Sequence, residues 1–327
     1  MSENECKYPM LEDEGIRRML IESDALNPPN TIHMTAKQQR AQYNDLSAHF
    51  GKPRPQSVRV SDHKIAGDNH QIPIRIYSPD TKEQTPVVFY IHGGGFVVGD
   101  LESHDDICGE ICERANVTVF GVEYRLAPEH KYPAAYDDCK SVLNAIDGFA
   151  ADFNFDSDRL VLAGDSAGGN LAAALCLYAR DTNGPAIKGQ VLVYAGLGGD
   201  TSKGSYISRG GKAALTAKDI DFKKTLFIGD VGVPGYTDKY AFPLLETDFS
   251  GLPPAFLSPA HFDPLCDDSE QYASLLRSAG IPAKVREEKL LVHAFLRGRH
   301  MSKAAGAAFS AIIEAIKSLA YQGSLPK

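Results

Sequence analysis

Residues 159–180 read RLVLAGDSAGGNLAAALCLYAR and carry the strongest structural signal in the chain. The run RLVLA has the composition of a buried strand, and NLAAALCLYAR has that of a helix. Between them lies Gly164-Asp165-Ser166-Ala167-Gly168. A serine on a sharp strand-to-helix turn holds its hydroxyl clear of the backbone, and small neighbours permit the crowding of such a turn. The stretch therefore predicts that Ser166 is a nucleophile at the end of a strand.

Short apolar runs alternate with helical stretches on both sides of this turn. Such runs, rich in Val, Ile, Leu and Phe and bounded by Gly, Pro and Asp, are typical of strands buried on both faces. Alternating strands and helices indicate a mostly parallel sheet with helices on both sides. We expect eight strands, the first two forming an antiparallel hairpin, over residues 57–65, 70–79, 85–92, 117–124, 159–165, 190–196, 254–260 and 283–289.

Two segments interrupt the alternation. Residues 1–55 contain short helical stretches separated by Pro-rich breaks, with too little apolar surface for a core of their own. Residues 198–240 are too long for an ordinary connection and are predicted to be an insertion with one or two helices. We expect both to form a helical cap over the carboxyl edge of the sheet, where ligands of open α/β sheets bind. Residues 56–197 and 241–327 then form the α/β catalytic domain.

Charge and composition exclude several kinds of partner. With 327 residues and a formal net charge of −8, the chain lacks the basic surface that a nucleic-acid-binding protein needs. Its acidic N-terminus is unlike a signal peptide, and we expect no membrane span. The six cysteines are scattered without CxxC pairing, which is typical of reduced packing residues. These features favour a cytoplasmic protein.

A glycine-rich segment, His92-Gly93-Gly94-Gly95-Phe96, follows the predicted strand at 85–92. Glycines expose backbone N–H groups and allow a ligand to approach closely. We expect an oxyanion hole in which Gly93, Gly94 and Ala167 donate N–H groups to a developing oxyanion. A phosphate-binding loop is disfavoured because the chain has no GxxxxGK[ST] sequence.

A serine nucleophile needs a base, and the base needs an orienting acid. In folds with this strand-to-helix serine the order along the chain is serine, acid, histidine. Asp263 is the first acid beyond the strand at 254–260, and it is preferred to Asp267 and Asp268, whose position suits a helix N-terminus. His293 follows the last predicted strand closely, whereas His300 lies in a basic turn. The predicted catalytic residues are therefore Ser166, Asp263 and His293.

Two other polar segments carry weaker signals. Residues 103–112 contain histidine, acids and two cysteines, but no second cluster has the spacing of a zinc site. We interpret this segment as a helix start with capping acids and expect no metal. Residues 124–130, YRLAPEH, are expected to lie at the edge of the active site.

Several motifs in order resemble the hormone-sensitive-lipase-like family of carboxylesterases, bacterial family IV, and in particular the acetyl esterases of bacteria. The resemblance runs from about residue 60 to the C-terminus and rests on HGGGF, YRLAPEHKYPAAYDD, GDSAGGNLA, DPLCDD and VHAF. It implies an α/β-hydrolase fold with a cap, no cofactor, and hydrolysis of short acyl esters. The family's catalytic roles are carried over to Ser166, Asp263, His293 and the Gly93/Gly94 loop. Ala195 stands where the family often has Pro, and Ala294 where Gly is more frequent.

The predicted function is serine carboxylesterase activity through an acyl-enzyme intermediate, on a small-molecule ester. Amide or lactone hydrolysis by the same three residues is one alternative. A non-catalytic binding protein on this fold is another, since fold alone does not fix function. A homodimer remains open.

Overall fold

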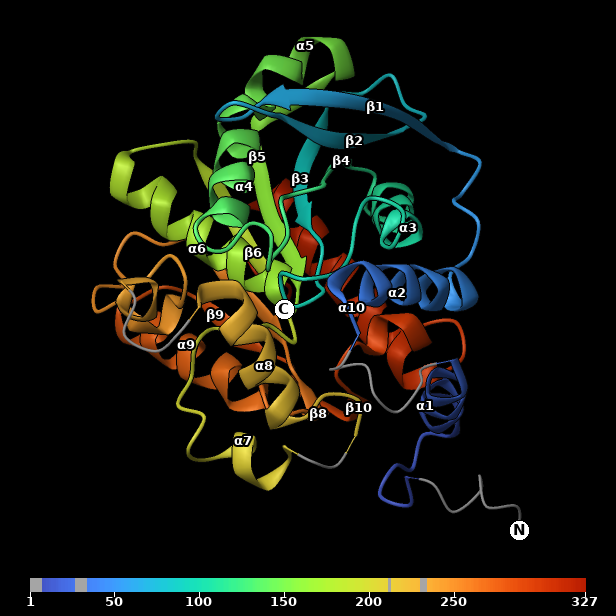
Figure 1. Cartoon of the computed structure of the whole chain (residues 1–327). Helices are drawn as coiled ribbons and strands as arrows, with labels where there is room; N and C mark the ends of the chain where they lie inside the picture. Colours follow the sequence, from blue (N-terminus) through green and yellow to red (C-terminus); the bar gives the residue numbers. More distant parts are fainter. Residues whose placement is uncertain (1–7, 27–33, 211–212, 230–233) are drawn as a thin grey trace.

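An eight-stranded sheet runs through the molecule in the order β1-β2-β4-β3-β5-β6-β7-β9 (Figure 1). The computed structural model describes residues 8–26, 34–210, 213–229 and 234–327. Strand β2 runs antiparallel to both its neighbours, and the other pairs are parallel. The predicted mostly parallel sheet with an initial hairpin is confirmed. Its strands are β1 (Val58–Ala66), β2 (Gln71–Pro79), β3 (Thr85–Ile91), β4 (Thr118–Val122), β5 (Phe155–Asp165), β6 (Ile187–Val193), β7 (Ala255–Ser258) and β9 (Ala283–Val285).

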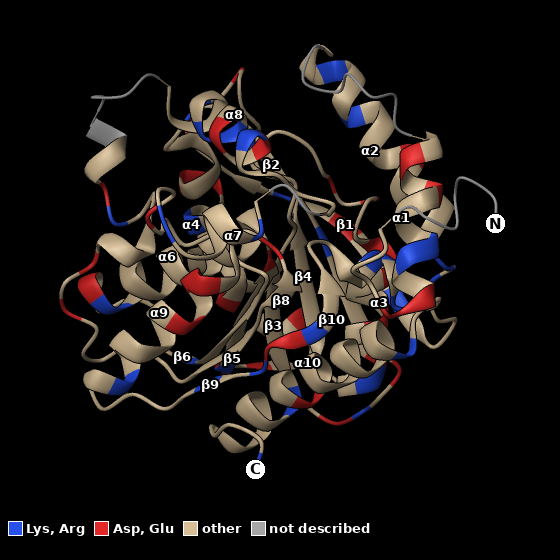
Figure 2. Ribbon diagram, turned by 90° about the horizontal axis from the view of Figure 1, so that it is seen from below, with Lys and Arg blue, Asp and Glu red and all other residues tan. Residues whose placement is uncertain are grey.

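Helices cover both faces of the sheet (Figures 1 and 2). Successive strand residues point to opposite faces. In β3, Val88 and Tyr90 therefore pack with α3 (Asp105–Ala115) and α10 (Lys303–Gln322), while Val87 and Phe89 belong to a second apolar cluster on the other face. That cluster contains residues of α4 (Ala134–Ala145), α6 (Ala167–Thr182) and α9 (Cys266–Ser278). A short helix α5 (Ala150–Phe153) leads into β5.

Helix α10 is long and apolar enough to cross a membrane by length and composition. Its apolar face, including Phe309, Ile312 and Ile316, is buried in the core cluster against the sheet. Amphipathic burial of this kind is what a core helix of an α/β layer requires.

The predicted strand at 283–289 is divided in two. Only β9 joins the large sheet, after which the chain turns away into β10 (Glu288–Val292). Strand β10 pairs in parallel with β8 (Ala260–Phe262) to form a separate two-stranded sheet. The apolar pattern of 283–292 shows extended chain but not the change of partner.

The two segments that interrupt the alternation are helical where the structure describes them. Residues 1–55 contain α1 (Glu14–Leu26) and α2 (Ala36–Phe50), and residues 198–240 contain α7 (Ser205–Ser208), α8 (Ala217–Ile228) and a 3₁₀ turn, Pro234–Thr237. Buried residues of α1 and α2 join the cluster of the large domain, as a segment without its own core must. Helices α1 and α2 lie beside each other and apart from α7 and α8 (Figures 1 and 2).

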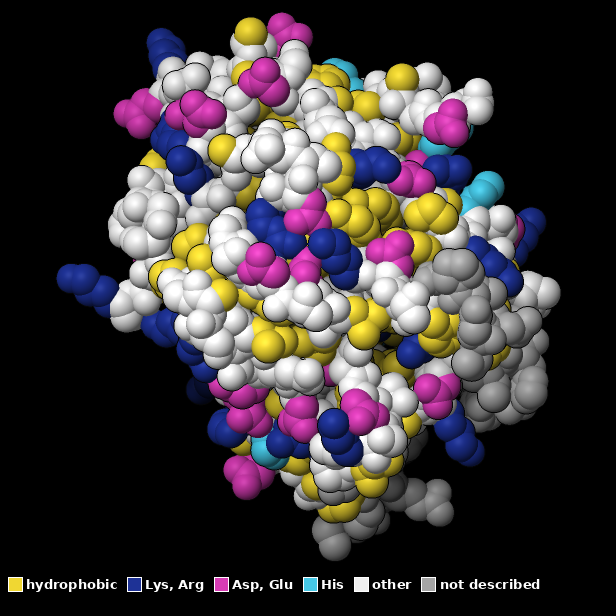
Figure 3. Space-filling model, turned by 90° about the vertical axis from the view of Figure 1, so that its left-hand side faces the viewer, with side chains coloured by type: hydrophobic (Ala, Val, Ile, Leu, Met, Phe, Trp, Pro, Cys, Tyr) yellow, Lys and Arg dark blue, Asp and Glu magenta, His cyan; other side chains and the backbone are white. Residues whose placement is uncertain are grey.

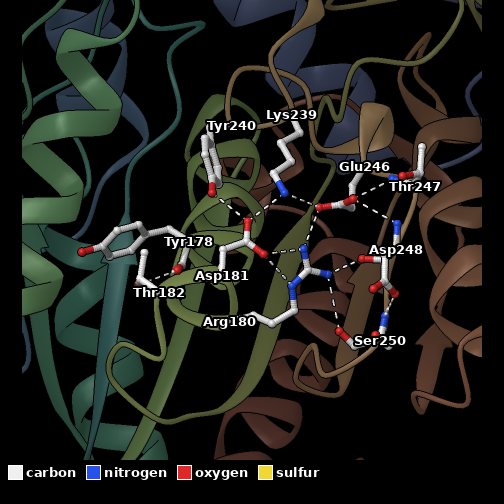
Figure 4. A network of polar contacts seen from close by, with 10 residues as sticks. All are labelled: Tyr178, Arg180, Asp181, Thr182, Lys239, Tyr240, Glu246, Thr247, Asp248 and Ser250. Carbon is white, nitrogen blue, oxygen red and sulfur yellow. Dashed lines mark hydrogen bonds and ion pairs between the residues drawn. The ribbon is translucent and has the colours of Figure 1, made fainter.

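An ion-pair network fastens the end of the insertion to α6 (Figure 4). Arg180 and Asp181, near the end of α6, bond with Lys239 and Glu246. The backbone N–H groups of Thr247 and Asp248 also donate to Glu246, and the pKa of that carboxyl falls to about 2 although burial opposes the shift. Connected pairs of this kind hold geometry better than isolated surface pairs do.

Charge is spread without a basic patch on the face drawn in Figure 3, where Lys and Arg side chains are interspersed with Asp and Glu. All five described cysteines are free and buried, as expected of packing residues, and Cys6 lies outside the described residues.

Candidate active site

Ser166 occupies the turn between β5 and α6 in a strained conformation, with φ 53° and ψ −118°. Close packing around the turn requires the flanking glycines. A Cβ on Gly168 would lie 1.9 Å from the carbonyl oxygen of Ile91, and one on Gly164 would lie 2.5 Å from the backbone of Gly168. The Ser166 N–H donates to the carbonyl oxygen of Val193 at 2.9 Å, so the turn is anchored on β6. Strain that is held by its surroundings in this way is common at functional sites.

The two-stranded sheet brings the predicted acid and base together. Phe262 of β8 pairs with Val292 of β10, so the residues that follow them, Asp263 and His293, leave the sheet side by side. Asp263 is fully buried and His293 is 8 % exposed.

A continuous hydrogen-bond chain joins the three predicted catalytic residues. The Nδ1 atom of His293 lies 2.6 Å from Oδ2 of Asp263, and its Nε2 atom lies 3.0 Å from Oγ of Ser166. The second oxygen of Asp263 accepts the N–H of Leu265, which fixes the carboxylate. This is the nucleophile, base and orienting-acid geometry of serine hydrolases.

The alternative acids and the second histidine are engaged elsewhere. Asp267 accepts the N–H of Ser205, and Asp268 accepts the N–H groups of Leu197 and Gly199. Burial raises the pKa of Asp268 to about 6. His300 lies on the surface, 2.9 Å from Glu110. None of these side chains bonds to Ser166 in the described part of the chain.

The glycine-rich loop corrects one predicted donor. The N–H of Gly93 donates to Oδ1 of Asp165 at 3.0 Å, and a Cβ on Gly93 would lie 2.4 Å from the same carboxylate. This N–H therefore cannot serve as an oxyanion donor, and the prediction for Gly93 was wrong. Gly94 and Gly95 line the cavity in front of Ser166, as Ala167 does. Within the described ranges, no hydrogen bond takes the N–H of Gly94 or Gly95.

The segment 124–130 supports this loop from behind, as a position at the site's edge suggests. The Tyr124 ring stacks on His92 with centroids 4.2 Å apart, and its hydroxyl donates to the carbonyl oxygen of His92. The N–H of Ala127 donates to the carbonyl oxygen of Phe96. Both ends of the glycine run are thereby fixed.

Asp165 is a buried residue whose contacts beside the glycine-rich loop the sequence did not reveal. Besides Gly93, its carboxylate contacts the Tyr90 hydroxyl at 2.9 Å and Nε2 of His104 at 3.2 Å. Burial raises the pKa of Asp165, but the His104 charge and the hydrogen bonds from His104, Tyr90 and Gly93 outweigh it and lower the pKa to about 2. The only signal was an acid placed at the end of an apolar strand, because its partners come from distant parts of the chain.

Segment 103–112 is a helix start, as interpreted from the sequence: α3 begins at Asp105. One group of possible metal ligands occurs among the described residues, formed by Asp106, Glu110 and His300. The Arg299 guanidinium lies 2.5 Å from Asp106 and 2.7 Å from Glu110, so these carboxylates already have a cationic partner.

A cavity of about 280 Å³ opens in front of Ser166. Ser166, His293 and residues 94–96 line the cavity on one side. We call these residues, together with Asp263 and Gly93 behind them, the floor. We call α1, α2 and α8 the roof. The roof contributes both apolar and polar side chains to the cavity wall, namely Met19, Leu20, Ser23, Asp24, Tyr43, Leu46, Ile220, Lys223, Lys224 and Phe227.

Several known proteins are similar in sequence to this chain. Residues 88–297 match a family model described as alpha/beta hydrolase fold. The chain is 37% identical over 272 residues to the carboxylic ester hydrolase LipN of Mycobacterium tuberculosis, covering 81% of this chain and 72% of LipN. It is 30% identical over 268 residues to the acetyl esterase of Salmonella schwarzengrund, covering 80% of each.

A solved esterase structure has the same fold. The hyperthermophilic esterase from the archaeon Pyrobaculum calidifontis superposes with a TM-score of 0.84 at 32% identity, over 93% of this chain and 97% of that one. The chain therefore belongs to the α/β-hydrolase-fold family, among the hormone-sensitive-lipase-like carboxylesterases.

Proposed function

We propose that this protein is a serine carboxylesterase that hydrolyses short-chain acyl esters through an acyl-enzyme intermediate. The observation that carries the proposal is the hydrogen-bond chain from Asp263 through His293 to Ser166, at the floor of the cavity. Relatives named carboxylic ester hydrolase and acetyl esterase support the same activity.

The chemistry follows from the positions of these groups. His293 takes the proton of Ser166 as the hydroxyl attacks the ester carbonyl, and then gives that proton to the leaving alcohol. Water repeats the sequence on the acyl-enzyme and releases the acid. Asp263 remains ionised and stabilises the imidazolium that forms in each step.

The N–H groups of Gly94, Gly95 and Ala167 are proposed to hold the tetrahedral oxyanion. Gly94 and Gly95 have φ values of 125° and 63°, which few other residues adopt, so the loop turns at these positions. Preorganised donors of this kind are worth on the order of 10²–10³ in turnover each.

The size of the cavity supports small substrates. Pockets for drug-sized ligands are commonly about 300–1,000 Å³, and this cavity lies just below that range at about 280 Å³. We propose that residues 1–55 and 198–240 act as a cap that limits acyl length, because side chains of α1, α2 and α8 form the wall opposite Ser166.

Hydrolysis of an ester series from acetyl to long acyl chains tests the proposal, with wild type compared with Ser166→Ala. We expect the wild type to prefer short chains and the folded variant to be inactive. Matched anilides separate esterase from amidase activity. A wild type without activity on any ester would reject the proposal, and circular dichroism of both proteins would show that each is folded.

A further inference from the structure

The cavity contains a pair of cationic side chains that ester hydrolysis does not require. Lys223 of α8 and Arg297, four residues beyond His293, both line it. Much of the remaining wall is apolar, including Met19, Leu20, Leu46, Phe227, Phe242 and Leu265. A cation is costly to place in such surroundings unless an anion accompanies it.

Neither cation has a carboxylate partner among the described residues. Lys223 makes one polar contact, from Nζ to the carbonyl oxygen of Gly94 at 3.2 Å. Asp219, one helical turn earlier, is bonded through Oδ2 to the N–H and hydroxyl of Thr216 at the start of α8. The Arg297 guanidinium lies over the Tyr43 ring, 4.5 Å from its centroid.

The two acids that line the described part of the cavity wall are also engaged. Asp165 is bonded by Gly93, Tyr90 and His104, and Asp24 accepts the Tyr8 hydroxyl at 2.6 Å. The third cation on the wall, Lys224, lies over the Phe242 ring at 4.7 Å. Among the residues that the structure describes, the cavity therefore presents more positive than negative charge to a bound molecule.

Lys223 also lies beside the reacting groups. A Cβ on Gly95 would lie 2.2 Å from its Cδ, so the lysine stem covers the loop proposed to hold the oxyanion. Burial lowers the pKa of Lys223 to about 8; Asp219 opposes this and the Arg297 charge adds to it. A nearby anion would restore the charged form of the lysine.

Resting on the proposed function, we propose that the substrates are esters that also carry a carboxylate, which Lys223 and Arg297 bind. The charge belongs on the acyl part, as in a half-ester of a dicarboxylic acid, or on the alcohol part, as in the acyl ester of a hydroxy acid. Ester cleavage itself is unchanged: Ser166 forms the acyl-enzyme and water releases it.

Two isosteric substrate pairs test this proposal and separate its two forms. Monoethyl succinate is compared with ethyl isocaproate for a charged acyl part, and the acetyl ester of β-hydroxypropionate with isoamyl acetate for a charged alcohol part. Acid release in a pH-stat gives kcat/KM for each. We expect the wild type to favour the charged member in at least one pair.

Variants then assign the preference to the cations. Lys223→Met should lower the charged-to-neutral ratio of kcat/KM about tenfold or more. The substrate carboxylate would then lose one of its two cationic partners in the cavity, and a buried charge without a partner is costly. Arg297→Gln should act in the same direction, and Lys223→Arg should retain the preference. Lys218→Met is the matched control, because Lys218 is exposed on the same helix and does not line the cavity. Inhibition by succinate, measured with isoamyl acetate, should weaken in parallel.

Three results would overturn the proposal: a wild type that disfavours the charged member of both pairs, a Lys223→Met variant that slows charged and neutral esters equally, or succinate inhibition unaffected by that variant. The second result would mean that Lys223 only supports the Gly94 loop. Failure of the proposed function is distinguishable, because the neutral esters would then be hydrolysed by neither wild type nor Ser166→Ala, or by both.

Discussion

The floor and the roof of the cavity are built in different ways. The floor is fixed by backbone pairing and buried hydrogen bonds. Ser166 is anchored on β6, and Asp263 and His293 follow directly after two paired strands. The roof is attached through side chains, such as Arg40, which donates to the carbonyl oxygens of Val97 and Ala127, and Lys223, which donates to that of Gly94.

This difference separates chemistry from selectivity. Hydrogen bonds within the floor depend on the pairing of strands that are distant in the sequence, so a change there should affect turnover for every substrate. Side chains of the roof line the cavity, and among the described residues none of them bonds to the side chains of Ser166, Asp263 or His293. We therefore expect a change there to alter the ranking of substrates. Four substitutions test this contrast, in order of decreasing expected effect.

Replacing Asp263 by Asn should have the largest effect. The amide cannot stabilise the imidazolium of His293 and can favour its wrong tautomer, so kcat should fall by about 10⁴ for short and long esters alike. Steady-state kinetics measure this, with Asp267→Asn as control, because Asp267 contacts Ser205 rather than His293. Equal losses in the two variants would contradict the assignment.

Replacing Asp165 by Asn should lower stability by roughly 3 kcal/mol, because His104 loses its buried partner. The folded pKa of Asp165 is about 2, below its ordinary value of 3.8. A carboxyl group whose pKa is lowered by folding stabilises the fold at pH values above its ordinary pKa. This contribution is lost as the pH falls through the pKa of the folded state.

Urea unfolding against pH checks the Asp165 prediction. The difference in free energy of unfolding between wild type and variant should shrink by about 2 kcal/mol between pH 4 and pH 2. Asp152→Asn is a control, since Asp152 is exposed on α5. A difference that is constant over this range would refute the lowered pKa of Asp165.

In the roof, Phe227→Ala should change selectivity instead of chemistry. The Phe227 ring is buried and stacks on Phe96 with centroids 3.6 Å apart at the cavity wall. Its removal should raise kcat/KM for octanoyl relative to butanoyl esters about tenfold, the lower end of what one methylene contributes in an apolar pocket. Leu226→Ala, on the same helix but outside the cavity wall, should leave the ratio as it is.

The smallest effect concerns Ala294, beside the catalytic histidine. Its φ of 59° is left-handed, which explains why the related family more often has Gly at this position. Ala294→Gly should raise the free energy of unfolding by about 0.5–1 kcal/mol, since the left-handed conformation is costly for Ala. Ala307→Gly, at an exposed site within α10, should have the opposite sign. Thermal unfolding of both variants tests this.

The same contrast explains what the sequence could predict. Strand β3 is a continuous apolar run, as is the second half of β5 at 160–164, and the turn at Ser166 has a local chemical signature, so these parts were predicted. The start of β5 at 155–158 is polar after Phe155, and the strand was therefore predicted to begin only at 159. Strands β8 and β10 are short, and their partners are set only in three dimensions, which is why 283–289 was interpreted as one strand. The helices of the roof could be predicted from the local periodicity of apolar residues, but their position over the floor could not.

The oxyanion loop shows the limit within the site. All three glycines at 93–95 are equivalent in the sequence, and only the side chain of Asp165, from a different strand, removes Gly93 as a donor. A hydrogen bond between residues 72 positions apart leaves no pattern that spacing could reveal. Asp263 and His293, by contrast, could be predicted because their order along the chain is constrained.

The pairing of β8 with β10 has a consequence for how the chain tolerates insertions. Asp263 and His293 are neighbours because Phe262 and Val292 are paired, and the length of chain between the two strands does not enter this relation. Added residues after Gly280, in the exposed turn that follows α9, would lengthen a loop and leave the two side chains in place. One residue added inside β10 would displace His293 by about 3.3 Å, the rise of a parallel strand, beyond hydrogen-bond reach of Ser166.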